Sequence, residues 1–487
     1  MDEITGYGSS TLQELDELNK ALGTGEVGDA YVGAGVAGDM TALRPQSLEG
    51  TLKVVTATIE QIKMWKRIGK KKAFNTVEEF NVMDSMGGNT SPFFTEGGLP
   101  NEEDSNYIRQ SQYVKFLGTT RVITHPATLV TNTVGDIVAR ETTNGTSWLL
   151  QQLEKGLYFA DSSLDSLAFD GIIPQVKNFV KGKPYETQHV IDMKGAPLDE
   201  STLEDICTVI ADNFGRGMLE LHMTNQVNKD LSKIIMGTSG RQRVIGTGTE
   251  VDLGAPVRGY LANTGRVEFV NNVFMKPQAT VPTASANGAP AVPTFPASQL
   301  TAAADTASNL AAGTYYYFVT AKNSAGESAP VSLGSIATTA GQAVTILINR
   351  VVTSPVAKSY KVYRGYYSDA TKAQFMVEVK DAGTGTTQSI VDENLNIPGT
   401  HTAILMDNDP DQVLAFKQLA PLMKLPLARI SAAERFMILL YGMVQVYNPR
   451  RMVVLKNIGT LGLNSNRELF TPSYGAASYG TVHPVLQ

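Results

Sequence analysis

The sequence has little of what most enzymes and metalloproteins use. Its 487 residues include one cysteine, Cys207, and five histidines. A single cysteine excludes an intramolecular disulfide, so the chain needs no oxidising compartment. It has no run of 18 apolar residues, which excludes a membrane-spanning helix, and we expect no membrane partner. The first residues are acidic and lack a basic region followed by an apolar core, so we also expect no secretory signal.

The polar residues form no recognisable reactive site. The histidines are widely dispersed, and none lies in an HExxH motif or beside the cysteine at metal-ligand spacing. Phosphate-loop, nucleophile-elbow and dinucleotide-binding glycine motifs are absent. Asp407, Asp409 and Asp411 resemble a calcium loop but lack its glycine and its distal glutamate, so we interpret them as a turn. We therefore predict a protein that is not an enzyme, with no catalytic, cofactor-binding or metal-binding residue.

Negative charge is concentrated in the first 50 residues. They hold nine acidic residues against two basic ones, whereas the whole chain has a net charge of −6. The remainder is close to neutral, which argues against a dedicated nucleic-acid-binding protein. We interpret residues 1–50 as an extended arm that is retained in the mature chain. It folds against another surface, because it has too few apolar residues to form a core.

Residues 51–72 place apolar side chains near helical spacing and end in a basic cluster. We predict a helix here, ending in Lys66, Arg67, Lys70, Lys71 and Lys72. One interpretation of the cluster is a solvated helix end that complements the helix dipole. The alternative is a contact with an acidic neighbour or with DNA.

Residues 73–124 predict a long two-stranded hairpin. The outgoing strand AFNTVEEFNVMD and the returning strand QYVKFLGTTRVIT flank a polar, glycine-rich tip that contains Glu102, Glu103 and Asp104. No histidine lies near these acids, so we do not interpret them as a metal site. A hairpin of this kind is marginal in water unless it packs on something, and we expect it to dock on a neighbouring subunit.

The middle of the chain has the pattern of an α+β body. Residues 135–164 predict a helix, and Ser201 with Glu204 forms a capping-box pattern before a second apolar stripe that includes Cys207. The position of Cys207 on that stripe favours core packing over a nucleophile. The segment MLELHM predicts a strand and QVNKDLSKIIMG another helix.

A composition change marks an insertion. Residues 277–304 carry five prolines and no charge, which predicts a linker. The next five alternating segments predict a small β-sandwich. After it, FMILLYGMVQVY predicts a buried strand, NPRR a turn, and MVVLKNIG a returning strand. The sandwich therefore interrupts another domain, as insertions at exposed loops do.

Two segments carry family resemblances. GTYYYFVTAKNSAGESAPVS with KSYKVYRG resembles an immunoglobulin or fibronectin type III-like module. LAPLMKLPLARISAAERFMILLYGMVQVYNPRRMVVLKNIG is similar to the C-terminal part of the major capsid proteins of tailed bacteriophages, whose shell fold is shared with herpesvirus capsids. The second resemblance implies an α+β fold with an N-terminal arm, an extended hairpin loop, a spine helix, a peripheral domain and an axial domain.

This order of parts implies a division of the whole chain. The expected segments are the arm (1–50), a peripheral segment (51–134) with the hairpin loop (73–124), the spine helix and peripheral domain (135–197), the axial domain (198–276), the linker and immunoglobulin-like insertion (277–401), the returns of the axial (402–430) and peripheral (431–460) domains, and a tail (461–487).

The resemblance implies a structural function. A major capsid protein self-assembles into the hexamers and pentamers of an icosahedral phage head, which encloses double-stranded DNA without sequence-specific binding. The expected location is the virion, after assembly in the bacterial host cytoplasm, and portal, scaffold and decoration proteins are expected partners. No cofactor is implied. The alternative is a glycan-binding adhesin or a phage tail component that carries the same β-sandwich.

Opposite charges provide candidate contacts between subunits. We expect the acidic hairpin tip, Glu102, Glu103 and Asp104, to meet basic side chains of a neighbouring copy. The basic candidates are Arg67, Lys70, Lys71, Lys72, Arg450 and Arg451.

Overall fold

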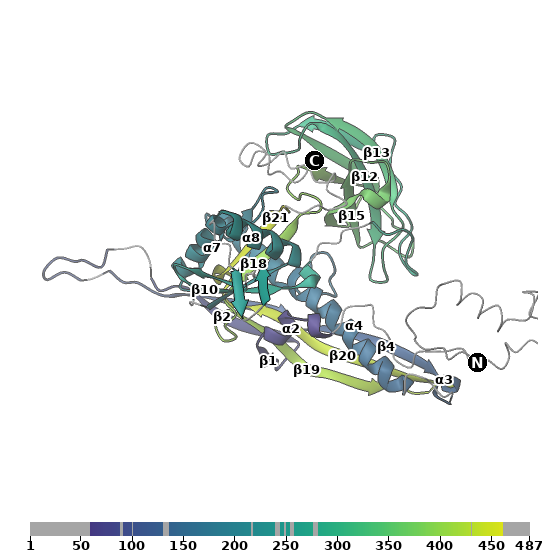
Figure 1. Cartoon of the computed structure of the whole chain (residues 1–487), viewed down its shortest axis with the longest axis horizontal. Helices are drawn as coiled ribbons and strands as arrows, with labels where there is room; N and C mark the ends of the chain where they lie inside the picture. The colour runs from purple at the N-terminus through teal and green to yellow at the C-terminus, as the bar shows by residue number, and fades with distance from the viewer. Residues whose placement is uncertain are drawn as a thin grey trace, which may run out of the picture. The chain divides into compact units, whose positions relative to one another are not determined.

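The computed structural model describes residues 59–87, 91–99, 101–129, 136–215, 218–238, 244–247, 250–253, 258–275, 281–429 and 431–460. The predicted arm (1–50) and tail (461–487) lie outside these residues. None of the helices in the described part of the chain is long and apolar enough to span a bilayer. The described strands form a four-stranded sheet, a six-stranded sheet, the two sheets of a β-sandwich and two two-stranded sheets (Figure 1).

One layer is a four-stranded sheet packed against a long helix. The strand order is β1-β19-β20-β4, in which β1 runs parallel to β19 and the other pairs are antiparallel. The elements are β1 (Lys70–Lys72), β4 (Lys115–Thr124), β19 (Leu414–Pro426), β20 (Ala433–Val446) and helix α4 (Ile137–Phe159). The helix confirms the long helix predicted for this region.

Helix α4 packs closely on one face of this sheet. Gly145 makes the approach possible, since a Cβ at that position would lie 2.7 Å from Cδ1 of Ile438 in β20. Further along, Leu149, Leu153 and Leu157 are buried in the stripe predicted from their spacing. On the same face of the sheet, Nζ of Lys424 donates to Thr142 of the helix at 2.8 Å.

The basic cluster before the hairpin is not the end of a helix, and that prediction is wrong. In the described part of 51–72, only η2 (Ile59–Gln61) and α2 (Met64–Arg67) are helical, and residues 70–72 form strand β1. The chain turns into the sheet at Gly69, where a Cβ would lie 2.3 Å from Cβ of Pro410. The carbonyl of Gly69 then accepts from the backbone N–H of Phe416 at 2.8 Å, which starts the pairing with β19.

The predicted hairpin is shorter than its expected range. Its strands are β2 (Val77–Ser85) and β3 (Asn106–Tyr113), paired antiparallel from Val77↔Tyr113 outward. After Val114 the chain continues as β4, which pairs with β20 instead of with the outgoing strand. Residues 115–124 therefore belong to the four-stranded sheet.

The second layer is a six-stranded sheet covered on one face by two helices. Its order is β5-β21-β18-β6-β10-β9. Side chains from α7, α8 and this sheet form one core, which includes Ile206, Leu221 and Leu455. The elements are β5 (Val190–Asp192), β6 (Met218–Met223), β9 (Gly259–Ala262), β10 (Gly265–Asn271), β18 (His401–Met406), β21 (Met452–Ile458), α7 (Glu200–Asp212) and α8 (Asn225–Thr238).

Helix α7 confirms the predicted helix but begins two residues earlier than the capping-box pattern indicates. Asp199 is the N-cap, and its carboxylate accepts from the backbone N–H of Thr202 at 2.9 Å. Ser201 lies inside the first turn. Cys207 is buried in the core, and burial raises the pKa of its thiol to about 12, with the charge of Glu204 adding to the effect. The residue is a core side chain, as predicted.

The strands after residue 400 change sheets along the chain. Residues 401–406 and 452–458 lie in the six-stranded sheet, whereas 414–426 and 433–446 lie in the four-stranded sheet. The predicted return of MVVLKNIG against FMILLYGMVQVY is therefore wrong, because β20 and β21 do not pair. The turn η5 (Pro449–Arg451), capped by the side chain of Asn448, directs the chain from one sheet to the other. We expected a domain boundary near residue 430, but the chain passes between the two sheets before residue 414 and again after residue 446.

Residues 281–397 form two facing sheets, as the alternating segments predicted. Their orders are β11-β14-β17 and β13-β12-β15-β16, and both sheets contribute to one core, for example Tyr317 and Ile346. The strands are β11 (Leu300–Ala304), β12 (Gly313–Lys322), β13 (Val331–Thr338), β14 (Gln342–Asn349), β15 (Ser359–Gly365), β16 (Gln374–Lys380) and β17 (Thr387–Asp392), with η4 (Ala370–Lys372).

The proline-rich stretch before this sandwich is not a free linker in its described part, so that prediction is corrected. Val281 is buried against Phe318 and Tyr363. The carbonyls of Thr294 and Gln299 accept from backbone N–H groups of β14 at 2.8 Å. Prolines supply no N–H for a regular ladder, yet their neighbours can still bond to a sheet edge.

Short elements complete the described chain: α3 (His125–Leu129), α5 (Ile172–Val180), α6 (Glu186–His189), β7 (Val244–Thr247), β8 (Glu250–Leu253) and η3 (Val273–Met275).

Candidate assembly surfaces and the joint between the sheets

The hairpin β2–β3 is attached to the rest of the chain at its root. Phe80 packs edge-on against Tyr447, with ring centroids 5.3 Å apart, and Gln112 bonds to Gln175 at 2.8 Å. Glu78 lies 3.5 Å from Nζ of Lys417 and accepts from two backbone N–H groups. Burial alone would raise the pKa of Glu78, but these contacts outweigh it and lower that pKa. The root is therefore fixed by packing, hydrogen bonds and an ion pair.

The outer part of the hairpin exposes apolar side chains instead of burying them. Leu99 is 92% exposed and Phe93 is 88% exposed, in a segment whose hydrogen bonds join its own residues, such as Asn101 to Ser91. Soluble proteins rarely leave such a group of large apolar side chains in water unless it binds a partner. The exposed set is Met83, Met86, Phe93, Phe94, Leu99, Tyr107 and Ile108.

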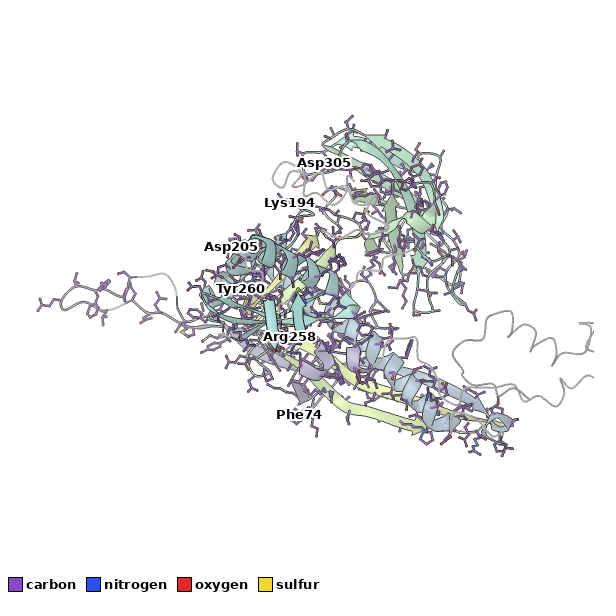
Figure 2. The ribbon with its side chains drawn as sticks, in the orientation of Figure 1. Phe74, Lys194, Asp205, Arg258, Tyr260 and Asp305 are labelled. Carbon is purple, nitrogen blue, oxygen red and sulfur yellow. The ribbon has the colours of Figure 1, made fainter. Side chains whose placement is uncertain are left out.

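A second apolar surface lies on the face of the four-stranded sheet opposite to α4. Strand alternation and register place seven side chains there, which we call the open face: Phe116, Val122, Met423, Leu425, Met437, Leu439 and Tyr441. Phe116 is 64% exposed and packs edge-on against Tyr441, with centroids 4.9 Å apart. Near the start of the hairpin, Phe74 also stands out from the ribbon (Figure 2).

The acidic tip and its candidate basic partners occupy different environments. Glu102, Glu103 and Asp104 are exposed in the hairpin loop. Three of the six candidate cations instead pair with acids of the body. These pairs are Arg67 with Glu220 and Glu268, Lys71 with Asp411, and Arg451 with Asp407.

The other three candidate cations lie over aromatic rings. Nζ of Lys70 lies 4.3 Å from the ring centroid of Trp65, and burial lowers the pKa of this lysine. Lys72 lies over Phe74, and Arg450 lies over Tyr185. In each of these contacts the cation is attracted by the negative face of the aromatic ring.

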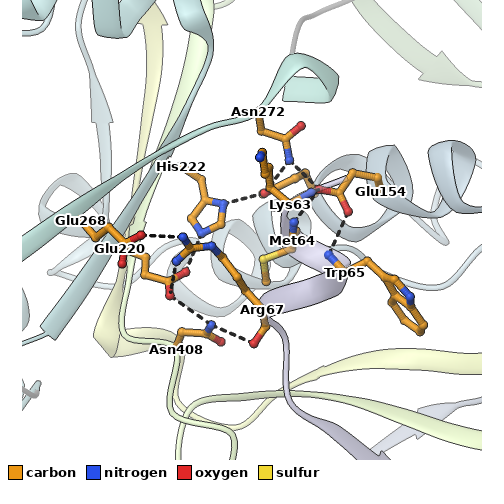
Figure 3. Close-up of polar contacts among 11 residues, drawn as sticks. Lys63, Met64, Trp65, Arg67, Glu154, Glu220, His222, Glu268, Asn272 and Asn408 are labelled. Atoms are coloured by element: carbon orange, nitrogen blue, oxygen red, sulfur yellow. Dashed lines mark hydrogen bonds and ion pairs between the residues drawn. The ribbon is translucent and has the colours of Figure 1, made fainter. Parts of the chain in front are cut away.

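A buried carboxylate joins α4 to the segment that leads into the hairpin. Glu154 is fully buried, and its Oε1 accepts from the backbone N–H groups of Lys63 (3.0 Å) and Met64 (2.6 Å), while Oε2 accepts from Trp65 (2.9 Å) (Figure 3). Nδ2 of Asn272, just after β10, donates to Oε1 at 2.6 Å. One side chain thus connects α4, α2 and the end of a strand of the six-stranded sheet.

The connection continues through a histidine in the same sheet. The hydroxyl of Tyr158 lies 2.7 Å from Nδ1 of His222. Nε2 of His222 lies 2.9 Å from the carboxylate of Glu220 (Figure 3). Burial raises the pKa of Tyr158 well above its usual range, so its hydroxyl stays protonated. A carboxylate can only accept, so Nε2 donates to Glu220, and Nδ1 accepts from Tyr158 when the ring is neutral.

Arg67 closes this network at the surface. Its guanidinium bonds to Glu220 at 3.1 Å and to Glu268 at 2.5 Å, while its carbonyl accepts from Asn408 at 3.3 Å. Burial alone would raise the pKa of Glu220, but the hydrogen bond from His222 and the charge of Arg67 outweigh it and lower that pKa. We call the network of Glu154, Tyr158, His222, Glu220, Arg67 and Asn272 the joint.

The joint was not predicted from the sequence. A signal was present, because Glu154 falls between Leu150 and Tyr158 at intervals of four residues in a helix, so a charge interrupts an apolar row. Its partners lie about 90 and 118 residues away and could not be paired from the sequence. In the described residues, no group of three or more histidine, cysteine or acidic side chains could hold a metal ion.

Comparisons with known proteins identify similar chains. No protein-family model matches the sequence. The chain is 25% identical to the major capsid protein of Staphylococcus phage K over 438 residues, which cover 86% of this chain and 91% of that protein. It is 26% identical to the major capsid protein of Staphylococcus phage S25-3 over 441 residues, with the same coverage. A putative major capsid protein of Enterococcus phage phiEF24C is 23% identical over 442 residues, and the match covers 90% of that protein.

Among solved structures, the chain resembles the capsid of an empty GTA particle. The TM-score is 0.48 at 10% identity, and the match covers 87% of this chain and 99% of the other.

The curated relatives confirm the predicted function. They span almost the whole length of the chain and are named as capsid proteins of bacteriophages, so the chain is a structural capsid protein of the virion. The alternative of an adhesin or tail component is not favoured. The mixed α+β architecture predicted from the sequence is confirmed as well. These relatives carry the names of structural proteins and not of enzymes, in line with the expected absence of catalysis.

Proposed function

We propose that many copies of this chain assemble, through the hairpin and the open face, into hexamers and pentamers of an icosahedral shell around double-stranded DNA. The observation that carries the proposal is the hairpin, fixed at its root and apolar along its exposed outer part. The open face supplies a second apolar surface in the same chain. Two different surfaces on one polypeptide allow head-to-tail contacts, which close into rings when the rotation between copies closes.

The parts of the fold match the roles expected from the family. The hairpin β2–β3 is the extended loop, α4 is the spine helix, and the four-stranded sheet is the peripheral domain. The six-stranded sheet with α7 and α8 is the axial domain, which surrounds the ring axis. We assign β18 and β21 to the axial domain and β19 and β20 to the peripheral domain, and the separate sheets in which these two pairs of strands lie support the assignment.

The sandwich is an inserted immunoglobulin or fibronectin type III-like module. Its position in the sequence, between the axial strands β10 and β18, supports an insertion into a loop. As a projecting module, it makes weak contacts with glycans or with neighbouring modules, or it acts as a passive spacer. Portal, scaffold and decoration proteins are further partners, and assembly takes place in the host cytoplasm.

Apolar contact area stabilises such a shell. A standard protein interface buries on the order of 1,600 Å², and apolar burial contributes about 25 cal/mol per Å². Several interfaces per subunit make dissociation slow, which gives kinetic stability to a container of DNA.

Opposite charges determine where the hairpin tip binds on a second copy. The tip acids, Glu102, Glu103 and Asp104, meet the basic side chains that lie over aromatic rings, Lys70, Lys72 and Arg450, of a second copy. Complementary charges mainly raise the association rate and select the partner.

A charge exchange tests this pairing. Reversal of the three tip acids to lysine should slow shell assembly about tenfold or more, measured by light scattering, with a weaker effect in high salt. Adding Lys72→Glu and Arg450→Glu to the reversed tip should restore part of the rate. Unchanged assembly of the tip variant rejects the pairing, and failure of the exchange rejects these two basic partners.

A further inference from the structure

The joint connects the parts of the chain whose relative orientation a shell subunit must control. Glu154 and Tyr158 belong to α4, which packs on the four-stranded sheet, whereas His222, Glu220 and Asn272 belong to the six-stranded sheet and its end. If the first sheet carries the contacts between rings and the second surrounds the ring axis, the angle between them sets the angle at which copies meet. This step rests on the proposed function.

Glu154 also holds the segment that leads into the hairpin. Its carboxylate receives three successive backbone N–H groups of residues 63–65, at the start of α2. Five residues after Trp65, strand β1 enters the four-stranded sheet, and the hairpin follows. A contact made by the hairpin therefore acts on a segment that is fixed to α4 and, through Arg67, to Glu220 and Glu268 of the six-stranded sheet.

The chemistry of the site gives it one preferred geometry. A carboxylate accepts four hydrogen bonds here, one from a side chain and three from the backbone, and no other acceptor in the described structure replaces it at these N–H groups. Buried donors without an acceptor are strongly disfavoured, so the three N–H groups keep α2 at this side chain. A shared, directional acceptor defines an orientation better than apolar contacts, which tolerate sliding.

We propose that Glu154 is a positioning residue for assembly: by fixing α2 and the six-stranded sheet against α4, it sets the curvature, and hence the diameter, of the shell. Arg67 acts in the same joint from its exposed side. This role is distinct from the contacts between subunits, because Glu154 is fully buried inside one chain.

The test compares shell diameters of variants by electron microscopy. Glu154→Gln keeps the side-chain size but turns an amide NH₂ toward a backbone N–H, which weakens the joint. Glu141→Gln is the matched control, because Glu141 lies on the same helix but pairs with Arg121 of β4, within the four-stranded layer, at 3.7 Å. We expect Glu154→Gln to lose the single wild-type diameter and form a broad or second population, and Glu141→Gln to keep it.

A second, milder variant tests the proposal even if Glu154→Gln misfolds. Arg67→Met removes both ion pairs from a side chain that is 33% exposed, so the subunit should fold, and we expect it to form a broad or second population of shell diameters, as Glu154→Gln does. Arg67→Lys, which keeps the charge, should lie closer to the wild type. If Arg67→Met and any soluble Glu154→Gln both form shells of the wild-type diameter, the proposal is wrong. If the wild type forms no shells, the proposed function itself fails.

Discussion

At the scale of single residues, the joint should depend on pH through Glu220. Its pKa is lowered in the folded chain, despite burial, by the hydrogen bond from His222 and by Arg67. A carboxylate with a depressed folded pKa contributes stability that is complete above its unfolded pKa and is lost as the pH falls through the folded value. For a glutamate, the unfolded value is about 4.3, so the contribution is present at neutral pH and declines once the pH falls below about 4.

This dependence predicts the behaviour of Glu220→Gln. At pH 7 we expect the variant to lose about 1–2 kcal/mol of stability, because Glu220 and Arg67 are partly exposed and solvent screens their pair. The difference from the wild type should shrink as the pH falls below about 4. Thermal unfolding of unassembled subunits at several pH values measures it, with exposed Glu60→Gln as the control. A difference that stays constant down to pH 3 contradicts the assignment.

Single residues also show what could and could not be predicted from this sequence. Cys207 could be placed correctly, since it lies on an apolar stripe with period 3.6 and needs no distant partner. Glu154 could be recognised as a charged residue in an apolar row, but its hydrogen-bond partners could not be predicted. They include the backbone N–H groups of residues 63–65, which are distant in the sequence. The candidate cations show the same limit, since Arg67, Lys71 and Arg451 find acids within their own chain.

At the scale of elements, local patterns predicted strands better than sheets. Strand β4 follows β3 after the single residue Val114, and both strands alternate, so no local pattern separates them. The partner of β4 is β20, more than 300 residues further on, and only that pairing decides where the hairpin ends. For the same reason, the division of residues 402–460 between two domains could not be read from an alternating pattern that is alike in both sheets.

The role of the sandwich in assembly can be tested by deleting it. Residues 281–394 should be removable, with a short glycine-serine linker, without loss of shell assembly or change of shell diameter. The deletion should stop before residue 395, because Asn457 of β21 donates to the carbonyl of Leu395 and accepts from the N–H of Ile397. Microscopy of the purified variant measures the outcome. Loss of assembly would mean that the sandwich takes part in forming the shell and is not a projecting addition.

At the scale of the whole molecule, the exposed hairpin, the open face and the buried joint have one common explanation. A chain that worked alone would gain nothing from leaving Phe93, Leu99 and Phe116 in water. Self-association covers these side chains. The joint would then transmit the geometry of each contact to the rest of the subunit.

Electron microscopy of the purified wild-type protein, combined with analytical ultracentrifugation, addresses self-assembly without any variant. We expect closed shells, sheets or rings of six copies, with a sedimenting species far larger than one chain of 52.4 kDa. Monodisperse monomers at every concentration, with the hairpin as accessible to protease as an exposed loop, would contradict the view that this protein acts by assembling with copies of itself.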